Sequence, residues 1–284
     1  MEKPKKIGLA LGGGAARGLT HIGVIKALEN AGISIDYIAG TSMGAIIGGY
    51  YAATKDIRRL EEVFSNIKRK DVFSFRDLIK NKDGAFFKGE LIANRLRKEL
   101  GDIEIEKCQI PFTAVATNVN NGEEELLNTG NLADAIGASS AIPLIFSPVE
   151  INGKLLMDGG LANPVPADVV KKMGAEYVIA VDTSSRWLEV SKEMVSVKDM
   201  YGVITQALST LEYHLAKNIL GEYADLVIKP PIFHQHWFQF ENAPEVIKIG
   251  VEETNLYLKE IRQKTGYKKQ EETLSEKFID FILN

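Results

Sequence analysis

Five residues, Gly-Thr-Ser-Met-Gly at positions 40–44, constrain the fold of this chain more than any other stretch. The apolar run over residues 33–39 predicts a buried strand before them, and the run of small and apolar residues over 45–53 predicts a buried helix after them. A serine on a tight turn between strand and helix is raised above the edge of a sheet, and the helix N-terminus behind it offers N–H groups to an anion. The stretch therefore predicts an α/β fold in which Ser42 is a nucleophile.

The glycines at the two ends of this turn, Gly40 and Gly44, have a steric explanation. The backbone of a nucleophile turn is strained and closely approached, so a Cβ atom would obstruct it. The simpler alternative is an ordinary turn in which Ser42 only caps the following helix. The five residues alone leave both interpretations open.

A glycine-rich loop lies further upstream. Residues 7–11 predict a central parallel strand, residues 12–18 (Gly-Gly-Gly-Ala-Ala-Arg-Gly) form the loop, and a helix follows that ends at Gly32. This βαβ unit would bring the loop and the serine turn to the same edge of one sheet. Exposed N–H groups beside a serine hydroxyl form an oxyanion hole beside a nucleophile. Arg17 would then steady the loop or add positive potential, unless it is a surface or helix-capping arginine.

Two nucleotide-binding folds also begin with a strand, a glycine loop and a helix. Asp36 lies at about the right distance for the ribose-binding acid of a dinucleotide fold, but it falls near the start of the second strand rather than at its end. The end of that strand is occupied by the serine turn. A P-loop is excluded because no Gly-Lys-Ser/Thr follows the glycines.

An acidic residue, Asp158, ends a predicted hairpin over 149–151 and 154–157 and is followed by Gly159 and Gly160. An acid at this position would place a carboxylate in a crowded loop at the end of a strand. The alternative interpretation is that Asp158 is only part of a polar turn. The sequence further predicts helices over 57–67, 89–100, 166–173, 200–220, 244–261 and 274–283, a helix capped by Asn131, and strands over 112–118, 124–128, 177–181 and 226–228.

Composition narrows the class of protein. With 284 residues, a net charge near −4 and a pI near 5.7, the chain can bury a large core and does not suit nucleic-acid binding. Cys108 is the only cysteine, which excludes an internal disulfide and indicates a reducing cytoplasm. The N-terminal lysines and the apolar run after them imitate a signal peptide, but the run is too short. We therefore expect a soluble cytoplasmic protein without a targeting or transmembrane segment.

Four blocks, over residues 13–18, 40–44, 138–143 and 158–160, together resemble bacterial patatin-like phospholipases across about the first two-thirds of the chain. Ala15 departs from the pattern, because it replaces the second glycine of the family's Gly-x-Gly-x-x-Gly loop. The resemblance implies one hydrolase domain over 1–284. Its catalytic core, about 5–185, would be a three-layer α/β/α sandwich with a mainly parallel sheet, followed by a helical region over about 190–284.

The resemblance also implies a serine acyl-ester hydrolase that cleaves phospholipid or lysophospholipid esters through an acyl-enzyme on Ser42, with Asp158 as base and the Gly13 and Gly14 amides as oxyanion donors. No cofactor and no metal is expected. The alternative is a regulatory or adaptor protein with a vestigial site. The expected site comprises Ser42 and Asp158, the loop residues Gly13, Gly14, Ala15, Arg17 and Gly18, the turn glycines Gly40 and Gly44, and the supporting glycines Gly159 and Gly160.

A Ser–Asp dyad makes a specific demand on the acid. A carboxylate in water is a weak base, but burial raises its pKa by disfavouring the charged form. Asp158 should therefore lie in a mostly dry pocket. A histidine base is the alternative, yet none of the four lies in a loop that is both after the acid and near a strand end, where a triad would need it. These histidines are His21, His214, His234 and His236.

Aromatic residues cluster in two segments that we expect to line the site entrance and admit acyl chains. They could instead pack the core or form a dimer interface. The sequence leaves open the head group, acyl position and chain length of the substrate, the oligomeric state, and whether the protein works at the inner membrane surface. The segments are Phe73, Phe75, Phe86 and Phe87, and residues 230–240 with Phe233, Trp237, Phe238 and Phe240.

Overall fold

The computed structural model describes residues 3–66, 90–143, 145–184, 200–232 and 239–268. Within these ranges the fold is built on an eight-stranded sheet in the order β5-β6-β3-β2-β1-β7-β8, with β4 paired to β3 beside this path. The strands are β1 (Ile7–Leu11), β2 (Tyr37–Thr41), β3 (Phe112–Asn118), β4 (Glu124–Leu127), β5 (Val149–Ile151), β6 (Lys154–Asp158), β7 (Tyr177–Val181) and β8 (Leu226–Ile228).

The centre of the sheet is parallel and one edge is antiparallel. Strands β3, β2, β1, β7 and β8 run in the same direction, whereas β4 and β6 run antiparallel to β3, and β5 runs antiparallel to β6. The carboxyl ends of the parallel strands therefore meet at one edge, which is where ligands bind in open α/β sheets.

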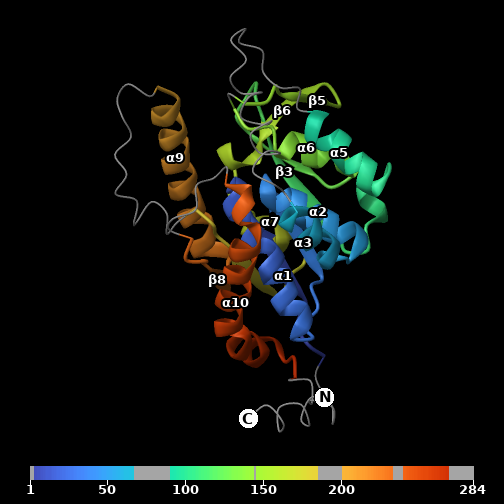
Figure 1. The fold of residues 1–284 in the computed structure, drawn as a ribbon, viewed down its shortest axis with the longest axis vertical. Coiled ribbons are helices and arrows are strands. Elements are labelled where there is room, and N and C mark those ends of the chain that lie inside the picture. Colours follow the sequence, from blue (N-terminus) through green and yellow to red (C-terminus); the bar gives the residue numbers. More distant parts are fainter. Residues whose placement is uncertain (1–2, 67–89, 144, 185–199, 233–238, 269–284) are drawn as a thin grey trace.

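Helices cover both faces of this sheet (Figure 1). They are α1 (Thr20–Asn30), α2 (Met43–Thr54), α3 (Ile57–Ser65), α5 (Glu90–Leu100), α6 (Leu132–Ser139), α7 (Ala167–Lys172), α9 (Met200–Tyr223) and α10 (Ala243–Thr265). The short 3₁₀ helices in the described ranges are η1 (Ala15–Leu19), η2 (Ile105–Lys107), η3 (Gly159–Leu161) and η4 (Phe240–Asn242). The described part of the chain is thus a three-layer α/β/α arrangement, as predicted.

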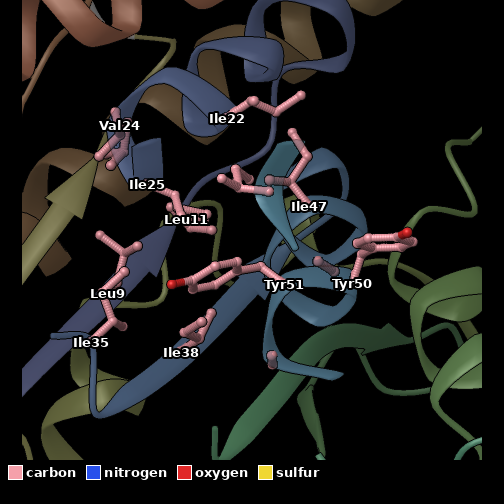
Figure 2. Close-up of a cluster of buried hydrophobic side chains, with 14 of the residues drawn as sticks. Leu9, Leu11, Ile22, Val24, Ile25, Ile35, Ile38, Ile47, Tyr50 and Tyr51 are labelled. Carbon is pink, nitrogen blue, oxygen red and sulfur yellow. The ribbon is translucent and has the colours of Figure 1, made fainter. Parts of the chain in front are cut away.

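The two faces of the sheet carry side chains of different size. On β1, Leu9 and Leu11 point into a large core shared with α1, α2 and α10, and Figure 2 shows them among isoleucines and tyrosines. The alternate residue Ala10 faces a smaller core formed with α7 and α9. Because successive strand residues point to opposite faces, large residues on one face and small ones on the other allow α7 to approach the sheet closely.

Most predicted elements are confirmed, and β7 and β8 have the predicted limits. The second strand is displaced, since β2 begins at Tyr37 and includes Gly40 and Thr41. Residues 33–36 form its approach instead: Ile33 N–H donates to the Leu28 carbonyl, and the Asp36 carboxylate accepts from Ile7 N–H. The predicted helix over 274–283 lies outside the described residues.

Candidate active site

The serine turn has the geometry of a nucleophile elbow. Ser42 directly follows β2 and precedes α2, and its φ of 55° and ψ of −118° lie in a region that residues with a side chain rarely occupy. Its side chain does not cap α2. The interpretation of Ser42 as a simple helix cap is therefore wrong, and the predicted strand–turn–helix setting is confirmed.

The steric argument for Gly40 and Gly44 is also confirmed. A Cβ atom on Gly40 would lie 2.4 Å from the Gly44 carbonyl oxygen. A Cβ atom on Gly44 would lie 2.0 Å from the Leu11 carbonyl oxygen. Both obstacles are main-chain atoms, so the elbow packs against β1 with no space for a side chain at either position.

Two serines at the C-terminal end of α6 support the elbow. The Ser42 N–H donates to Ser139 Oγ (3.0 Å), and Ser139 Oγ donates to the Val115 carbonyl (2.5 Å). Ser140 Oγ donates weakly to the Ser42 carbonyl, at 3.4 Å. The resemblance includes residues 138–143 but assigns them no role. The structure shows that Ser139, in this block, connects the elbow to β3.

Sheet register brings Asp158 level with Ser42. Thr41 pairs with Val115 on β3, and the next residue, Ala116, pairs with Asp158 on β6. Ser42 and Asp158 therefore flank Ala116 across three neighbouring strands. Ser42 acts on the Asp158 carboxyl group as a hydrogen-bond partner that lowers its pKa, and both residues are 6% exposed.

The environment of Asp158 makes it a usable base. Burial raises the pKa of its carboxyl group from 3.8 to about 6, against the opposing effect of hydrogen bonds from Gly160 N–H (2.8 Å) and Ser42. Above that pH the group is a carboxylate, and because its pKa is raised it accepts a proton more readily than an ordinary aspartate does. Gly159 completes the acid loop, since a Cβ atom there would lie 2.2 Å from the Val115 carbonyl oxygen.

The glycine loop lies against Ser42. A Cβ atom on Gly13 would be 3.6 Å from the Ser42 Cβ atom. The Gly13 amide, which the resemblance assigned to an oxyanion, instead donates to the Pro164 carbonyl at 3.1 Å, and the Gly13 carbonyl accepts from Thr183 Oγ1. The assignment of the Gly13 amide to an oxyanion is therefore wrong, because Gly13 is bonded within the protein and holds the loop in place.

Two other loop amides remain for an oxyanion. In the part of the chain that the structure describes, the N–H groups of Gly14 and Ala15 donate to no protein acceptor. Both residues have positive φ, 133° for Gly14 and 48° for Ala15. Ala15 thus adopts the left-handed conformation that glycine accepts more readily, which explains why the family pattern has glycine here.

Arg17 is buried, so the interpretation as a surface arginine is wrong. Burial lowers the pKa of its guanidinium to about 10, and the negative charges of Glu212 and Asp182 oppose that shift. Gly18 follows at a close contact, because a Cβ atom there would lie 2.6 Å from Met43 Cγ. The loop therefore carries a buried positive charge beside the start of α2.

Glu212 on α9 is a site residue that the sequence prediction missed. The pKa of its carboxyl group is raised to about 7, first by burial and also by the Asp158 charge, against the opposing effect of Arg17. The available signal was its spacing: Glu212 stands four and eight residues before the buried Ala216 and Leu220, on the stripe that α9 turns inward. An acid on such a stripe requires a partner or a function.

The described histidines do not form a triad. His21 is fully buried, its Nε2 contacts the Gly12 carbonyl oxygen at 2.8 Å, and burial lowers its pKa to about 4. It supports the loop as a neutral side chain. His214 is exposed and packs its ring edge-on to Tyr213. His234 and His236 lie outside the described residues, as do the aromatic residues of the first expected entrance segment and residues 233–238 of the second.

Within the described ranges, no cluster of three or more histidine, cysteine, aspartate or glutamate side chains could hold a metal ion. None of the helices in those ranges combines the length and the apolar character required to span a bilayer.

Comparison with known proteins agrees with this geometry. A family model described as patatin-like phospholipase matches residues 9–171. An uncharacterized NTE family protein of Mycobacterium tuberculosis is 39% identical over 179 residues, which cover 62% of this chain and 48% of that protein. Lysophospholipase NTE1 of Saccharomyces cerevisiae is 28% identical over 313 residues, covering 98% of this chain and 18% of that protein.

The chain thus spans about half the length of the mycobacterial relative and a small part of the yeast one. Among solved structures, VipD from Legionella pneumophila superposes with a TM-score of 0.52 at 13% sequence identity, over 91% of this chain and 67% of that one. This likeness concerns the fold alone, and it agrees with the layered sheet described above.

Proposed function

This chain belongs to the patatin-like phospholipase family, and on that premise we propose that it is a serine ester hydrolase that cleaves acyl esters of phospholipids or lysophospholipids. One observation carries the proposal: sheet register brings Ser42 level with a buried carboxyl group, Asp158, on which it acts as a hydrogen-bond partner and whose pKa is raised to about 6. Acyl transfer requires at least a nucleophile and a neighbouring base, and this pair lies at the carboxyl edge of a parallel sheet.

The proposed reaction proceeds in two halves. In the first, the Ser42 oxygen attacks the ester carbonyl while its proton passes to Asp158, and the oxyanion accepts hydrogen bonds from the Gly14 and Ala15 amides. Asp158 then gives the proton to the departing alkoxide, which leaves an acyl-enzyme. In the second half, Asp158 takes a proton from water and the hydroxide formed attacks the acyl carbon. The bond from that carbon to the Ser42 oxygen then breaks, Asp158 returns the proton to this oxygen, and the fatty acid leaves.

The choice of lipid esters rests on relatives rather than on the dyad, because the same pair could attack any activated ester. The yeast relative is named a lysophospholipase, and it aligns with 98% of this chain. A single-chain lipid is a simple substrate for this site, since it can leave a micelle or bilayer more easily than a diacyl lipid. As part of the same proposal, the protein acts in the cytoplasm at a lipid surface.

Active-site labelling tests the chemistry directly. A fluorophosphonate probe should label the parent protein on Ser42, as located by mass spectrometry of the labelled peptide. The Ser42→Ala variant should stay unlabelled, and Ser65→Ala, which changes an exposed serine at the end of α3, should retain labelling. A folded parent protein that resists the probe would overturn the proposal in favour of a vestigial site.

A substrate panel then tests the lipid class. Lysophosphatidylcholine, lysophosphatidylethanolamine, the matching diacyl lipids and a short-chain nitrophenyl ester should be compared with the Ser42→Ala variant as background. We expect the lysophospholipids to have the highest kcat/KM. Hydrolysis restricted to the short-chain ester would contradict the lipid assignment while leaving the serine chemistry intact, and flotation with liposomes would test the lipid surface separately.

A further inference from the structure

A second carboxyl group, that of Glu212, lies beside the dyad, and the reaction as described does not use it. Glu212 belongs to α9, which packs against the acid loop at η3 and against α7. Gly160 marks the point of contact: a Cβ atom there would lie 2.8 Å from Glu212 Oε1 and 3.1 Å from Asp158 Oδ1. The bare Gly160 therefore separates two carboxyl groups that a side chain would push apart.

The distances make electrostatic coupling unavoidable. Two oxygens that both lie about 3 Å from one point are at most about 6 Å apart, and at that range like charges disfavour each other. The charged groups that face Glu212 are Asp158 from the end of β6 and Arg17 from η1, and Asp182 after β7 acts in turn on Arg17. The Glu212 carboxylate is thus repelled by the charge of Asp158 and attracted by the charge of Arg17.

We propose that Glu212 is a positioning residue that sets the basicity of Asp158: ionised beside Arg17, it makes the dyad a stronger base than Asp158 would be alone. The inference rests on the proposed function of the dyad. When Asp158 accepts the Ser42 proton, it becomes neutral and its repulsion with the Glu212 carboxylate disappears. That relief favours the proton transfer on which nucleophilic attack depends.

This arrangement predicts that the Asp158–Glu212 pair ionises in two steps as the pH rises, whereas Asp158 alone would ionise in one. The pair should lose its protons in two steps, near pH 6 and near pH 7, which belong to the pair as a unit. Between the steps only one carboxylate is present. Above the second step both are charged, and Asp158 gains its additional basicity.

The test is the pH dependence of Ser42 reactivity. Rates of fluorophosphonate labelling and kcat/KM for a short-chain soluble ester should be measured from pH 5 to pH 9 for the parent, Glu212→Gln and Glu212→Asp. Glu222→Gln is the matched control, because Glu222 is an exposed acid on the same helix. Ser42→Ala supplies the background, and circular dichroism and thermal melting establish that each variant is folded.

We expect parent rates to rise through both steps, and Glu212→Gln to show one step near pH 6. At pH 8.5 that variant should be about threefold to tenfold slower than the parent, with equal rates at pH 5.5. Glu212→Asp should retain the second step, and Glu222→Gln should match the parent. A uniform decrease at every pH, or an unchanged profile, would overturn the inference.

The two proposals fail in distinguishable ways. Labelling that does not depend on Ser42 would refute the proposed function itself. Labelling that depends on Ser42 but follows a single ionisation in both parent and Glu212→Gln would refute only the role given to Glu212. If Glu212→Gln does not fold, Glu212→Asp decides, since loss of its second step would equally contradict the inference.

Discussion

The nucleophile elbow at residues 40–44 is held by main-chain contacts, whereas α9 brings Glu212 to the same site through side-chain packing. At the elbow, a Cβ atom on Gly44 would lie 2.0 Å from a carbonyl oxygen of β1. On α9, a Cβ atom on Gly221 would meet nothing within 4 Å, and Leu211 is 62% exposed. The elbow has no space for an added side chain, whereas α9 borders solvent.

The difference separates two tasks within one site. A nucleophile must be held to within fractions of an ångström, so its position is built from strand register and glycine contacts that few sequences satisfy. A charge that adjusts basicity acts over several ångströms, and a helix packed through residues such as Ala216 and Leu220 is sufficient to carry it. Substitutions in the two regions should therefore differ in both kind and size of effect.

The largest effect should come from the dyad. Ser42→Ala and Asp158→Asn should each lower kcat/KM for ester hydrolysis by about a thousandfold or more, because nucleophile and base act as one unit. For the same reason the double variant should be no worse than either single one. Steady-state kinetics on the three variants measure this, and losses that multiply would show that the two residues act independently.

Histidine variants are the controls for this prediction. His214→Ala should keep activity within about tenfold of the parent, because a lost general base costs about a hundredfold or more and His214 is exposed. His21→Ala should lower thermal stability, since it removes a buried ring bonded to the Gly12 carbonyl, while its folded fraction keeps activity within about tenfold. A folded histidine variant as inactive as Ser42→Ala would favour a triad.

The next largest effect should distinguish the two regions by stability. Gly44→Ala should destabilise the protein by about 3 kcal/mol or more, because its methyl group meets a main-chain oxygen that cannot move without shifting β1. Gly221→Ala, the same chemical change on α9, should stabilise by about 0.5–1 kcal/mol through helix propensity. Urea unfolding measures both. Equal effects would mean that the elbow is less tightly packed than its contacts indicate.

The parts of the site that the sequence predicted are those built from main-chain geometry, and the parts that it did not predict depend on tertiary packing. The elbow, the glycine loop and the Asp158-Gly-Gly turn were predicted because each requires a special backbone, and a special backbone restricts which residues can occupy it. Ser139 fell within a matching block, yet its bond to the Val115 carbonyl depends on how α6 docks on β3. Local pattern carries no information about that docking.

Two failures have definite physical causes. Glu212 was missed because its partner Asp158 is 54 residues away in the chain, and only the packing of α9 on η3 brings them together. Gly13 was misassigned because its amide has a competing acceptor, the Pro164 carbonyl, on a distant loop. In both cases the deciding contact is tertiary, whereas the motif describes only the local chain.

A moderate effect should reveal the cost of keeping Asp158 buried. Its folded-state pKa of about 6 exceeds the ordinary value of 3.8, so the folded protein binds this proton more tightly and loses stability as the pH rises from about 4 through 6. Asp158→Asn removes that loss. The variant should be more stable than the parent at pH 8, by up to about 3 kcal/mol, and the difference should shrink toward pH 4. Thermal melting across this range measures it, and a stability difference independent of pH would contradict the prediction.

The smallest effect should come from Ala15, which tests whether the loop holds the conformation that its sequence disfavours. Ala15 has a φ of 48°, where a side chain costs about 1 kcal/mol relative to glycine. Ala15→Gly should therefore stabilise the protein by up to about 1 kcal/mol and leave kcat/KM within about threefold, because the amide keeps its place beside Ser42. Ala16→Gly is the matched control: Ala16 is fully buried in η1 and is not among the residues with positive φ, so the same change should destabilise by about 1 kcal/mol. Destabilisation by both variants would mean that Ala15 does not occupy the left-handed region in solution, and the oxyanion role given to its N–H would lose its geometric support.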